Sequence, residues 1–447
     1  MGRRSHSRSL SLWINGERVG RWTIPTRGEM ELRYEPGWVA ADIGRPLSLS
    51  LPFNLDNFPL KGEKVAHYFD NLLPDSEVIR TRVAERFRTG STAPFDLLKA
   101  IGRDCVGAVQ ILGEDETPQG FDRIEGTPLS EEAIERHLIE TVSSRTFGAG
   151  GDLDADFRIS LAGTQEKTAF LWWDGHWRAP HGATPTSHIF KLPLGLVGGR
   201  RADFTTSVDN EWLCLRLLKA YGLDVADARM ATFGKQRVLV VERFDRRVSP
   251  DGRWLMRLPQ EDFCQVEGCS PLRKYENEGG PGLAALFTTL RKSVNAEADM
   301  KTLMAAQVLF WLLRAPDGHA KNFSIRMLPR GRFRLTPLYD VMSAYPVLGV
   351  RPDQWAPHDV KLAMALLGKN RHYAMHTIHR RHFDSTAQKV GYAPTAKPII
   401  EAILTRTPAA IAEVQADLPQ DFSPHVAETI LGGLEHAAAA LGAMTPS

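Results

Sequence analysis

Carboxylate and amide side chains that suit a divalent cation stand close together in the sequence after Pro316. Asp317 is followed five positions later by Asn322, and a second carboxylate, Asp340, follows further along. Magnesium prefers oxygen ligands, and phosphoryl transfer needs a cation beside the phosphates and a group that orients the attacking hydroxyl. These residue types therefore suit phosphoryl transfer. Taken alone, the segment 317–322 is more typical of a polar turn.

The elements on either side of this segment favour the chemical interpretation. The largely apolar run 300–313 predicts a buried helix that ends before Pro316. After the polar segment, apolar residues alternate over 323–337 around a turn at 329–331, which predicts a short hairpin. A loop Asp, an Asn, a hairpin and a second Asp occur in this order in protein kinases, where the first Asp accepts the proton of the substrate hydroxyl.

On this pattern Asp317 is the predicted catalytic residue, and Asn322 and Asp340 are the predicted magnesium ligands. The hairpin between them is expected to return the second ligand to the first. His319 is expected to brace the loop, and Lys321 to contact the γ-phosphate of ATP.

Lys191 lies within the apolar strand segment 189–192, where a lysine without a partner is rare. In a kinase such a lysine contacts the α- and β-phosphates and pairs with a glutamate on the next helix, for which Glu211 is the candidate. The alternatives are an edge-strand lysine that reaches solvent and an exposed glutamate in a first helical turn. Two further strands lead to the run 241–244, whose backbone groups are expected to meet the adenine.

The segment 160–168 connects two predicted strands and stands where a phosphate-covering loop is expected. It contains Gly163 and Lys167, and the lysine could reach a phosphate as a point charge. A single glycine is a weak phosphate-binding pattern, so an ordinary hairpin remains the alternative.

Three units are predicted along the chain. Residues 1–115 form an α+β subdomain, which opens with a hairpin turning at Asn15-Gly16 and includes a helix capped by Asp75. Residues 116–250 form a β-rich nucleotide-binding lobe, with a helix capped by Ser130 and a strand at 157–161. Residues 251–447 form a mostly helical catalytic lobe. The predicted fold class is α+β: a protein-kinase-like fold of two lobes with an additional N-terminal α+β subdomain.

The bulk composition narrows the classes of protein. The chain has 447 residues, of which 43% are hydrophobic, and a formal net charge of +2, which argues against wholesale coating of nucleic acid. No run approaches the roughly 20 apolar residues of a membrane span, and the start lacks the apolar centre of a signal peptide. The four cysteines have no metal-binding spacing, which indicates reduced thiols and a cytoplasmic protein without membrane contact.

The combined motifs resemble the HipA family of serine/threonine-protein kinase toxins over most of the chain. In the two predicted lobes the motifs are RISLAGTQEKT at 158–168, IFK at 189–191, VERFDR at 241–246, DGHAKNFS at 317–324 and YD at 339–340. In the first unit they are LSLSLP at 47–52 and FDNLLPD at 69–75.

The resemblance implies ATP and Mg2+ as cofactors and a protein serine as the acceptor, in known cases on glutamate–tRNA ligase, which stalls translation and leads to growth arrest or persistence. It implies a small helix-turn-helix antitoxin, HipB-like, that binds operator DNA with the toxin as corepressor. The residues that would contact the nucleotide are Ala162, Gly163, Thr164, Gln165, Glu166, Lys167, Lys191, Glu211, Glu242, Arg243, Phe244, His319, Ala320, Lys321, Asn322 and Tyr339.

Autophosphorylation of Ser160 is also implied by the resemblance, as an off-switch. A phosphate there would add about −1.5 to −2 charge beside the nucleotide loop. The alternative is a plain serine at the end of a strand.

Other functions stay open on the residues alone. A small-molecule or lipid kinase could share the Asp and Asn arrangement, and a non-catalytic repressor subunit could retain a degenerate pocket. Basic residues at 369–372 and 379–382 could meet phosphates in an antitoxin–DNA assembly, or could form a solvated helical face.

Overall fold

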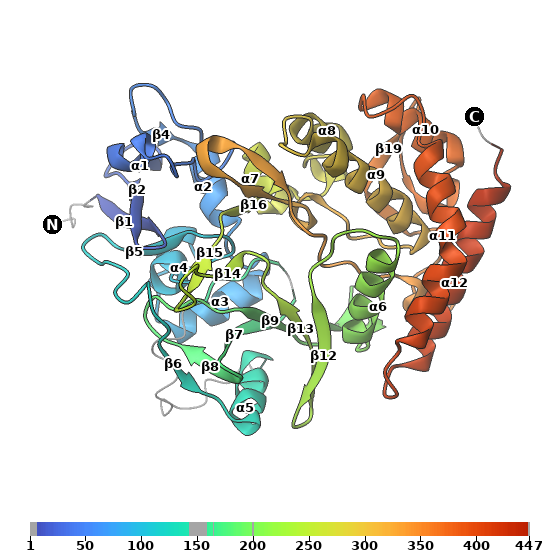
Figure 1. Cartoon of the computed structure of the whole chain (residues 1–447), viewed down its shortest axis with the longest axis horizontal. Helices are drawn as coiled ribbons and strands as arrows, with labels where there is room; N and C mark the ends of the chain where they lie inside the picture. The colour runs from blue at the N-terminus through green and yellow to red at the C-terminus, as the bar shows by residue number, and fades with distance from the viewer. Residues whose placement is uncertain (1–6, 143–158, 164, 199–200, 446–447) are drawn as a thin grey trace.

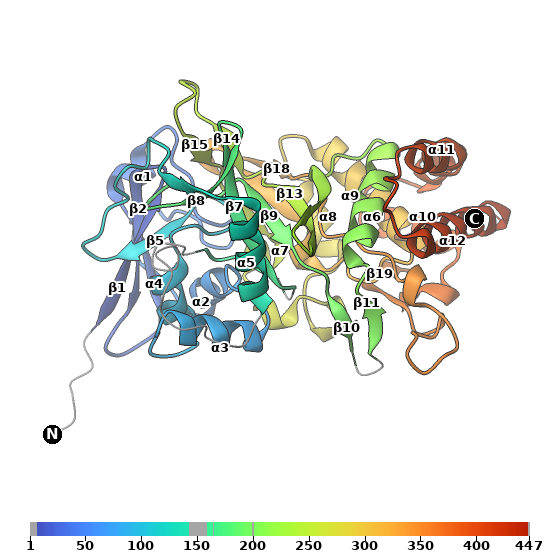
Figure 2. The same cartoon turned by 90° about the horizontal axis from the view of Figure 1, so that it is seen from below.

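The computed structural model describes residues 7–142, 159–163, 165–198 and 201–445. Buried apolar residues form three hydrophobic cores, which draw on residues 10–111, 134–240 and 202–441. The first unit lies at one end of the molecule, and the helices α11 (Lys397–Ala416) and α12 (Pro424–Ala443) lie side by side at the other end (Figures 1 and 2). Among the helices of these ranges, none combines the length and the apolar character that crossing a membrane requires.

A five-stranded sheet of order β4-β3-β2-β1-β5 builds the first unit. Its strands are β1 (Arg8–Ile14), β2 (Glu17–Ile24), β3 (Glu31–Tyr34), β4 (Leu60–Lys61) and β5 (Gln110–Gly113), and its helices are α1 (Pro36–Ala40), α2 (Glu63–Asp70), α3 (Glu77–Arg86) and α4 (Pro94–Ile101). The predicted turn joins β1 to β2, because Asn15 and Gly16 take the left-handed φ values of +48° and +86°. Trp22 of the sheet stacks on Phe69 of α2 at 3.9 Å between ring centroids, which fixes the helix on the sheet.

Two predictions are wrong, one for the first unit and one for the segment 157–161. The cap of α3 is Ser76, whose hydroxyl accepts from the backbone N–H of Ile79 at 3.4 Å. Asp75 instead forms an ion pair with Lys274 at 2.9 Å, so a distant partner takes the carboxylate that the sequence assigned to the helix end. The expected strand 157–161 is also absent over its described part, where Ile159 makes a single bridge to Asp104; residues 157 and 158 lie outside the described ranges.

A six-stranded sheet of order β12-β13-β9-β7-β8-β6 forms the next lobe. Its strands are β6 (Gly126–Pro128), β7 (Lys167–Trp173), β8 (His176–Pro180), β9 (His188–Lys191), β12 (Ala228–Phe233) and β13 (Gln236–Glu242). The helix α5 (Glu131–Val142) packs on this sheet, and Ser130 caps it as predicted by accepting from Ala133 N at 3.2 Å. Strand β9 is central, and its Lys191 is the cross-strand partner of Lys167 on β7.

Helices dominate the remainder of the chain, as predicted. They are α6 (Ser207–Ala220), α7 (Phe263–Glu267), α8 (Leu283–Leu290), α9 (Ala296–Leu312), α10 (Arg380–Lys389), α11 and α12. The strands here are β10 (Gly195–Val197), β11 (Ala202–Phe204), β14 (Arg246–Val248), β15 (Leu255–Arg257), β16 (Gln260–Asp262), β17 (Ser324–Met327), β18 (Phe333–Leu335), β19 (Lys361–Leu367) and β20 (Arg371–Ala374). The β17–β18 hairpin agrees with the prediction, whereas the β19–β20 hairpin had no prediction. The division at residues 115 and 250 stays a prediction; α6 precedes the second boundary, and its apolar residues pack in the largest core.

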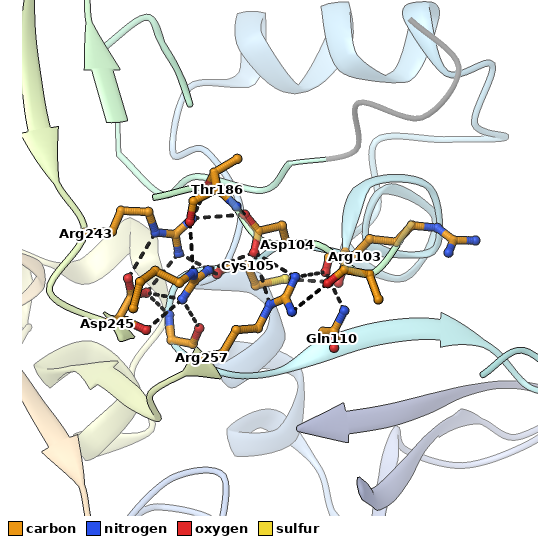
Figure 3. Close-up of polar contacts among 12 residues, drawn as sticks. Arg103, Asp104, Cys105, Gln110, Thr186, Arg243, Asp245 and Arg257 are labelled. Atoms are coloured by element: carbon orange, nitrogen blue, oxygen red, sulfur yellow. Dashed lines mark hydrogen bonds and ion pairs between the residues drawn. The ribbon is translucent and has the colours of Figure 1, made fainter. Parts of the chain in front are cut away.

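A buried cluster of ion pairs fastens the first unit to both following parts (Figure 3). Asp104 lies before β5 and is 4% exposed. It pairs with Arg243 at 3.2 Å, Arg246 at 2.8 Å and Arg257 at 3.2 Å, and Asp245 pairs with the first two of these arginines. Burial alone would raise the pKa of Asp104, but the arginines outweigh it and hold this pKa below its usual value. The cluster thus stays charged and joins Asp104 of the first unit to the segment 243–257, which is far away in the sequence.

Candidate active site

The predicted catalytic loop, residues 317–322, follows α9 and is held by hydrogen bonds of one amide side chain. The nitrogen Nδ2 of Asn322 donates to the backbone oxygen of Asp317 at 2.6 Å and to the backbone oxygen of Asp340 at 3.4 Å. The β17–β18 hairpin therefore returns Asp340 to the loop, as the sequence predicted. Since Nδ2 is the donor in both contacts, Oδ1 is the atom of Asn322 that could bind a cation.

Lys191 ends β9 and joins the two lobes through two carboxylates. Its ammonium lies 2.6 Å from Glu211 Oε1 on α6 and 2.8 Å from Asp340 Oδ1. Lys191 is 7% exposed, which excludes the alternative of a lysine that reaches solvent. Burial would lower the pKa of Lys191, but Asp340 and Glu211 outweigh it and raise this pKa above its usual value. The predicted pair of Lys191 and Glu211 is therefore formed, and the structure adds Asp340 as a second partner of the lysine.

Asp340 occupies a strained backbone conformation. Its φ is +59°, in the left-handed region that residues other than glycine rarely adopt, and such strain is common at functional positions. Lys191 outweighs the effect of burial and holds the pKa of Asp340 below its usual value. In the described ranges no group of three or more His, Cys, Asp or Glu side chains could hold a metal ion. A cation between Asn322 and Asp340 would thus take phosphate and water oxygens as its other ligands, which is the habit of magnesium.

The predicted phosphate loop lies over the same place. Lys167 Nζ donates to the backbone oxygen of Ala162 at 2.6 Å, and a Cβ on Gly163, whose φ is +107°, would lie 2.6 Å from that ammonium. Only glycine therefore fits at this position without displacing the lysine. Burial, followed by the charge of Lys191, lowers the pKa of Lys167 to about 8. Gln165 donates to the backbone oxygen of Leu192 at 2.5 Å, and Thr164 lies outside the described residues.

Ser160 is fully buried at the base of this loop. Its hydroxyl donates to the backbone oxygen of Leu72 at 2.7 Å, and its N–H donates to the backbone oxygen of Asp104 at 3.0 Å. The backbone N–H of Asp75 donates to the oxygen of Gly163 at 3.0 Å. The phosphate loop is thus docked on the first unit, and the serine is not exposed to a second kinase molecule in this conformation.

Two cavities meet at Asp317. The inner cavity measures about 140 Å³ and is lined by Lys191, Glu242, Phe244, Asn322 and Tyr339, among others. The outer cavity measures about 1060 Å³, and its wall includes apolar residues of the β10–β11 and β19–β20 hairpins and the intervening loops. Lys167, Asp317 and Asp340 line both cavities. These three residues therefore lie at the boundary between the two cavities.

Three residues predicted to bind the nucleotide have their side chains committed elsewhere. Lys321 gives its ammonium to Asn71 O at 3.2 Å, Asn71 Oδ1 at 2.8 Å and Asp262 Oδ2 at 2.8 Å, so the predicted phosphate contact is wrong and this residue braces the loop instead. Glu166 forms an ion pair with Arg82 of α3. The guanidinium of Arg243 belongs to the Asp104 cluster, where Figure 3 shows it directed at Asp104 and Asp245.

The expected hinge is only partly free to meet adenine. The N–H groups of Glu242 and Arg243 donate to Asp227 O at 2.8 Å and to Ser187 O at 2.9 Å. Phe244 and Tyr339 line the inner cavity, with 5.8 Å between their ring centroids. An apolar face for the adenine is therefore present, whereas the two N–H donors are used within the protein.

The remaining loop residues are buried supports. His319 has Nε2 3.7 Å from Asp317 Oδ1, and burial lowers its pKa. Ala320 is fully buried, and its N–H donates to Lys274 O at 3.3 Å. These contacts agree with the bracing that was predicted for His319.

Sequence reasoning missed two residues beside the catalytic loop. The hydroxyl of Tyr275 donates to Asp317 Oδ1, and Lys274 lines the inner cavity while paired with Asp75. Both belong to the irregular segment between α7 and α8, which has no periodicity and no motif. Neither residue had a signal that local pattern analysis could detect.

Comparison with known proteins places both parts of this architecture in one family. The model of the HipA N-terminal domain matches residues 10–112, and that of the HipA-like C-terminal domain matches residues 159–411. The putative kinase Y4mE of Sinorhizobium fredii is 35% identical over 347 residues, which cover 76% of this chain and 79% of that protein. The serine/threonine-protein kinase toxin HipA of Shewanella oneidensis is 27% identical over 354 residues, which cover 76% and 74%.

A solved structure agrees with the fold. In the complex of Shewanella oneidensis HipA, HipB and operator DNA, one chain matches with a TM-score of 0.78 at 23% identity, covering 97% of this chain and 98% of that chain. The predicted α+β fold, with two kinase-like lobes and an additional N-terminal subdomain, is thereby confirmed. The chain belongs to the HipA family, as the resemblance of its motifs predicted.

Proposed function

We propose that this chain is an ATP- and Mg2+-dependent serine/threonine-protein kinase of the toxin type. The observation that carries the proposal is the line of contacts from Asp317 through Asn322 to Asp340 and Lys191. It holds a proton acceptor, a cation site and a phosphate-binding cation in the order that phosphoryl transfer needs. The names of the two relatives, putative kinase Y4mE and serine/threonine-protein kinase toxin HipA, support the same activity.

In the proposed reaction the protein groups position the two substrates and neutralise the charge of the phosphates. Lys191 and Lys167 face the phosphates from two adjacent strands. A carboxylate oxygen of Asp317 accepts the proton of the acceptor hydroxyl, whose oxygen bonds to the γ-phosphorus. The bond to the oxygen that bridges the β- and γ-phosphates then breaks, and ADP leaves with that electron pair. Bound magnesium, held by Asn322 Oδ1 and the Asp340 carboxylate, would neutralise phosphate charge.

The outer cavity supports a protein as the acceptor. It opens on the side chain of Asp317, which is 42% exposed, and at about 1060 Å³ it exceeds the inner cavity several-fold. Its wall carries the apolar side chains Phe204, Met342, Trp355, Val360, Leu362 and Tyr373. Such a wall suits a segment of polypeptide that carries a serine. The acceptor proposed from the family resemblance is a translation factor such as glutamate–tRNA ligase, whose modification causes growth arrest or persistence.

The proposed partners are a HipB-like helix-turn-helix antitoxin and, through it, operator DNA, with this chain as corepressor. The support is the similar solved structure, in which HipA, HipB and operator DNA form one complex. The proposed regulatory site is Ser160. Because this serine is buried against Leu72, its phosphorylation requires the loop 160–163 to leave the first unit, and the added charge of about −1.5 to −2 would keep it away.

The decisive experiment is incubation of the full chain with Mg2+ and ATP labelled at the γ-phosphate, in a bacterial lysate. A labelled protein band other than the chain itself supports the proposal, and mass spectrometry of that band tests glutamate–tRNA ligase as the acceptor. Asp317→Ala should abolish the label, whereas Asp251→Ala, at a surface loop, should retain it. Label only in small molecules or lipids would establish the alternative kinase class, and absence of Mg·ATP binding would indicate a non-catalytic repressor subunit.

A further inference from the structure

The segment 274–278 lies at the boundary between the two cavities. Lys274 lines the inner cavity, and Tyr275 and Glu278 line the outer cavity. Between the two cavities stands Asp317, which lines both. The backbone oxygen of Lys274 accepts from the N–H of Ala320, so the segment is attached to the catalytic loop itself.

Tyr275 fixes the proposed proton acceptor. Its hydroxyl donates to Asp317 Oδ1, and its ring meets the ring of His319 edge-on at 5.0 Å between centroids. The ring contact with His319 and the hydrogen bond to Asp317 together fix the orientation of Tyr275. Since Oδ1 is bound in this way, Oδ2 is the oxygen that faces an acceptor hydroxyl. This hydrogen bond restricts rotation of the carboxylate and so favours one orientation of Oδ2 toward an acceptor hydroxyl.

Lys274 supplies a cation to the inner cavity, which Asp317 also lines. Among the described residues, four lysines line the inner cavity, and two of them already contact several acceptors: Lys191 has two carboxylates and Lys321 has three acceptors. The ammonium of Lys274 forms an ion pair with Asp75 at 2.9 Å, and its side chain is 13% exposed. Asp75 has a second cation, Lys321, at 4.0 Å, so it keeps a partner if Lys274 moves to another anion.

The electrostatics of Asp75 are consistent with such an exchange. Burial would raise the pKa of Asp75, but Lys321 and Lys274 outweigh it and lower this pKa. The carboxylate is therefore ionised near neutral pH. Its Oδ1 is buried without a hydrogen-bond partner in the described part of the chain. A phosphate, which carries a larger negative charge than the Asp75 carboxylate, can therefore replace it as the partner of Lys274.

We infer that Lys274 and Tyr275 form a second catalytic segment, in which Lys274 binds the γ-phosphate and Tyr275 positions Asp317. This inference rests on the proposed kinase function and assigns to Lys274 the contact that the sequence had predicted for Lys321. During transfer the ammonium stays protonated and follows the phosphoryl group from ADP to the acceptor oxygen. Tyr275 keeps its proton and moves no electrons.

Nucleotide binding by the full chain tests the role of Lys274. With Mg2+ present, the wild type should bind ATP more tightly than ADP, and Lys274→Met should weaken ATP about 10-fold while ADP stays within about 2-fold. Lys274→Arg should restore part of the ATP affinity, because it keeps the charge. Lys292→Met, at an exposed lysine of the same lobe, is the matched control and should change neither affinity.

Rates of lysate labelling at saturating ATP test the role of Tyr275. Tyr275→Phe should reduce the rate about 10-fold and leave ATP affinity within about 2-fold, because the phenol touches Asp317 and lines the outer cavity. Tyr392→Phe, at a tyrosine that packs against Phe287 away from both cavities, should match the wild type. Retained ADP affinity shows that each variant is folded.

Specific results would overturn the inference. If Lys274→Met weakens ATP and ADP affinity equally, or changes neither, the proposed contact of Lys274 with the γ-phosphate is refuted. If Tyr275→Phe labels lysate protein at the wild-type rate, the proposed positioning of Asp317 is refuted. A wild type that labels lysate protein while both variants behave normally sinks only this inference. If the wild type binds ATP but transfers no label, the proposed function is refuted. In that case, loss of the preference for ATP over ADP in Lys274→Met would still establish the contact with the γ-phosphate.

Discussion

Removal of the negative charge of Asp104 should destabilise the fold far more than removal of a surface aspartate. Asp104 is 4% exposed and accepts from Thr186 N at 3.0 Å and Thr186 Oγ1 at 2.7 Å, besides its three arginines (Figure 3). In Asp104→Asn the side-chain shape is kept, but Arg243 and Arg246 then have only the carboxylate of Asp245, and Arg257 has no carboxylate partner. The new NH2 group also places its donors against donors of the arginines. Loss of one partner of a buried ion pair costs about 3–5 kcal/mol of unfolding free energy.

The measurement is chemical denaturation of the full chain at pH 7, followed by circular dichroism and by tryptophan fluorescence. Agreement of the two probes shows that the parts of the chain unfold together, and only then does the midpoint report one free energy. Because the cluster joins the first unit to both following parts, we expect a shift of the whole transition. Separation into two transitions would instead mean that the cluster alone couples the units.

Asp251→Asn is the matched control, since Asp251 pairs with Arg253 at 2.7 Å on the surface. Exposed pairs contribute little because water and salt screen them, so the midpoint should stay at the wild-type value. If Asp104→Asn were as stable as this control, the view that Asp104 neutralises the buried arginines would be refuted.

Three further predictions concern the cleft and the acid range. Gly163→Ala should weaken Mg·ATP binding in calorimetric titrations, because its Cβ would lie 2.6 Å from Lys167 Nζ; unchanged affinity would contradict the proposed phosphate loop. Ser160→Asp should lower lysate labelling and expose the loop to protease, while Ser160→Ala should do neither, because only the carboxylate is costly to bury beside Leu72 O. The melting temperature should fall as the pH drops below about 4. Asp104 and Asp340 have pKa values below their usual range in the folded protein, so each stabilises the fold while ionised and loses this effect when it is protonated. A melting temperature that stays constant down to pH 2 would contradict these shifts.

The sequence predicted those parts of the site whose partners are close along the chain or on adjacent strands. Asp317, Asn322 and Asp340 are joined by one loop and one hairpin, so their spacing already brought them together. Lys191 was found because a charged residue within an apolar strand needs a carboxylate, and Glu211 on the next helix supplies one.

The errors arise where a side chain has a partner from a distant segment. Lys321 was assigned to phosphate, but Asn71 of the first unit and Asp262 take its ammonium. Asp75 was assigned to a helix end for the same reason, because the local pattern gives no sign of Lys274. Tyr275 was missed entirely, since its hydrogen bond to Asp317 is a product of tertiary packing and not of a motif.

The docking of the phosphate loop on the first unit has a consequence for inhibition at a distance. The inner cavity of about 140 Å³ is smaller than the roughly 300 Å³ at which ligand pockets begin, so nucleotide entry requires its walls to move; the loop 160–163, held to Leu72 and Asp75, is one of these walls. Exposure of Ser160 needs the same displacement. By thermodynamic reciprocity, a protein that clamps the loop to the first unit weakens ATP binding by the factor by which ATP weakens the clamp. A partner protein seated on the first unit would then weaken ATP binding without contacting Asp317, Asn322 or Asp340, and the ATP concentration would set how firmly that partner holds.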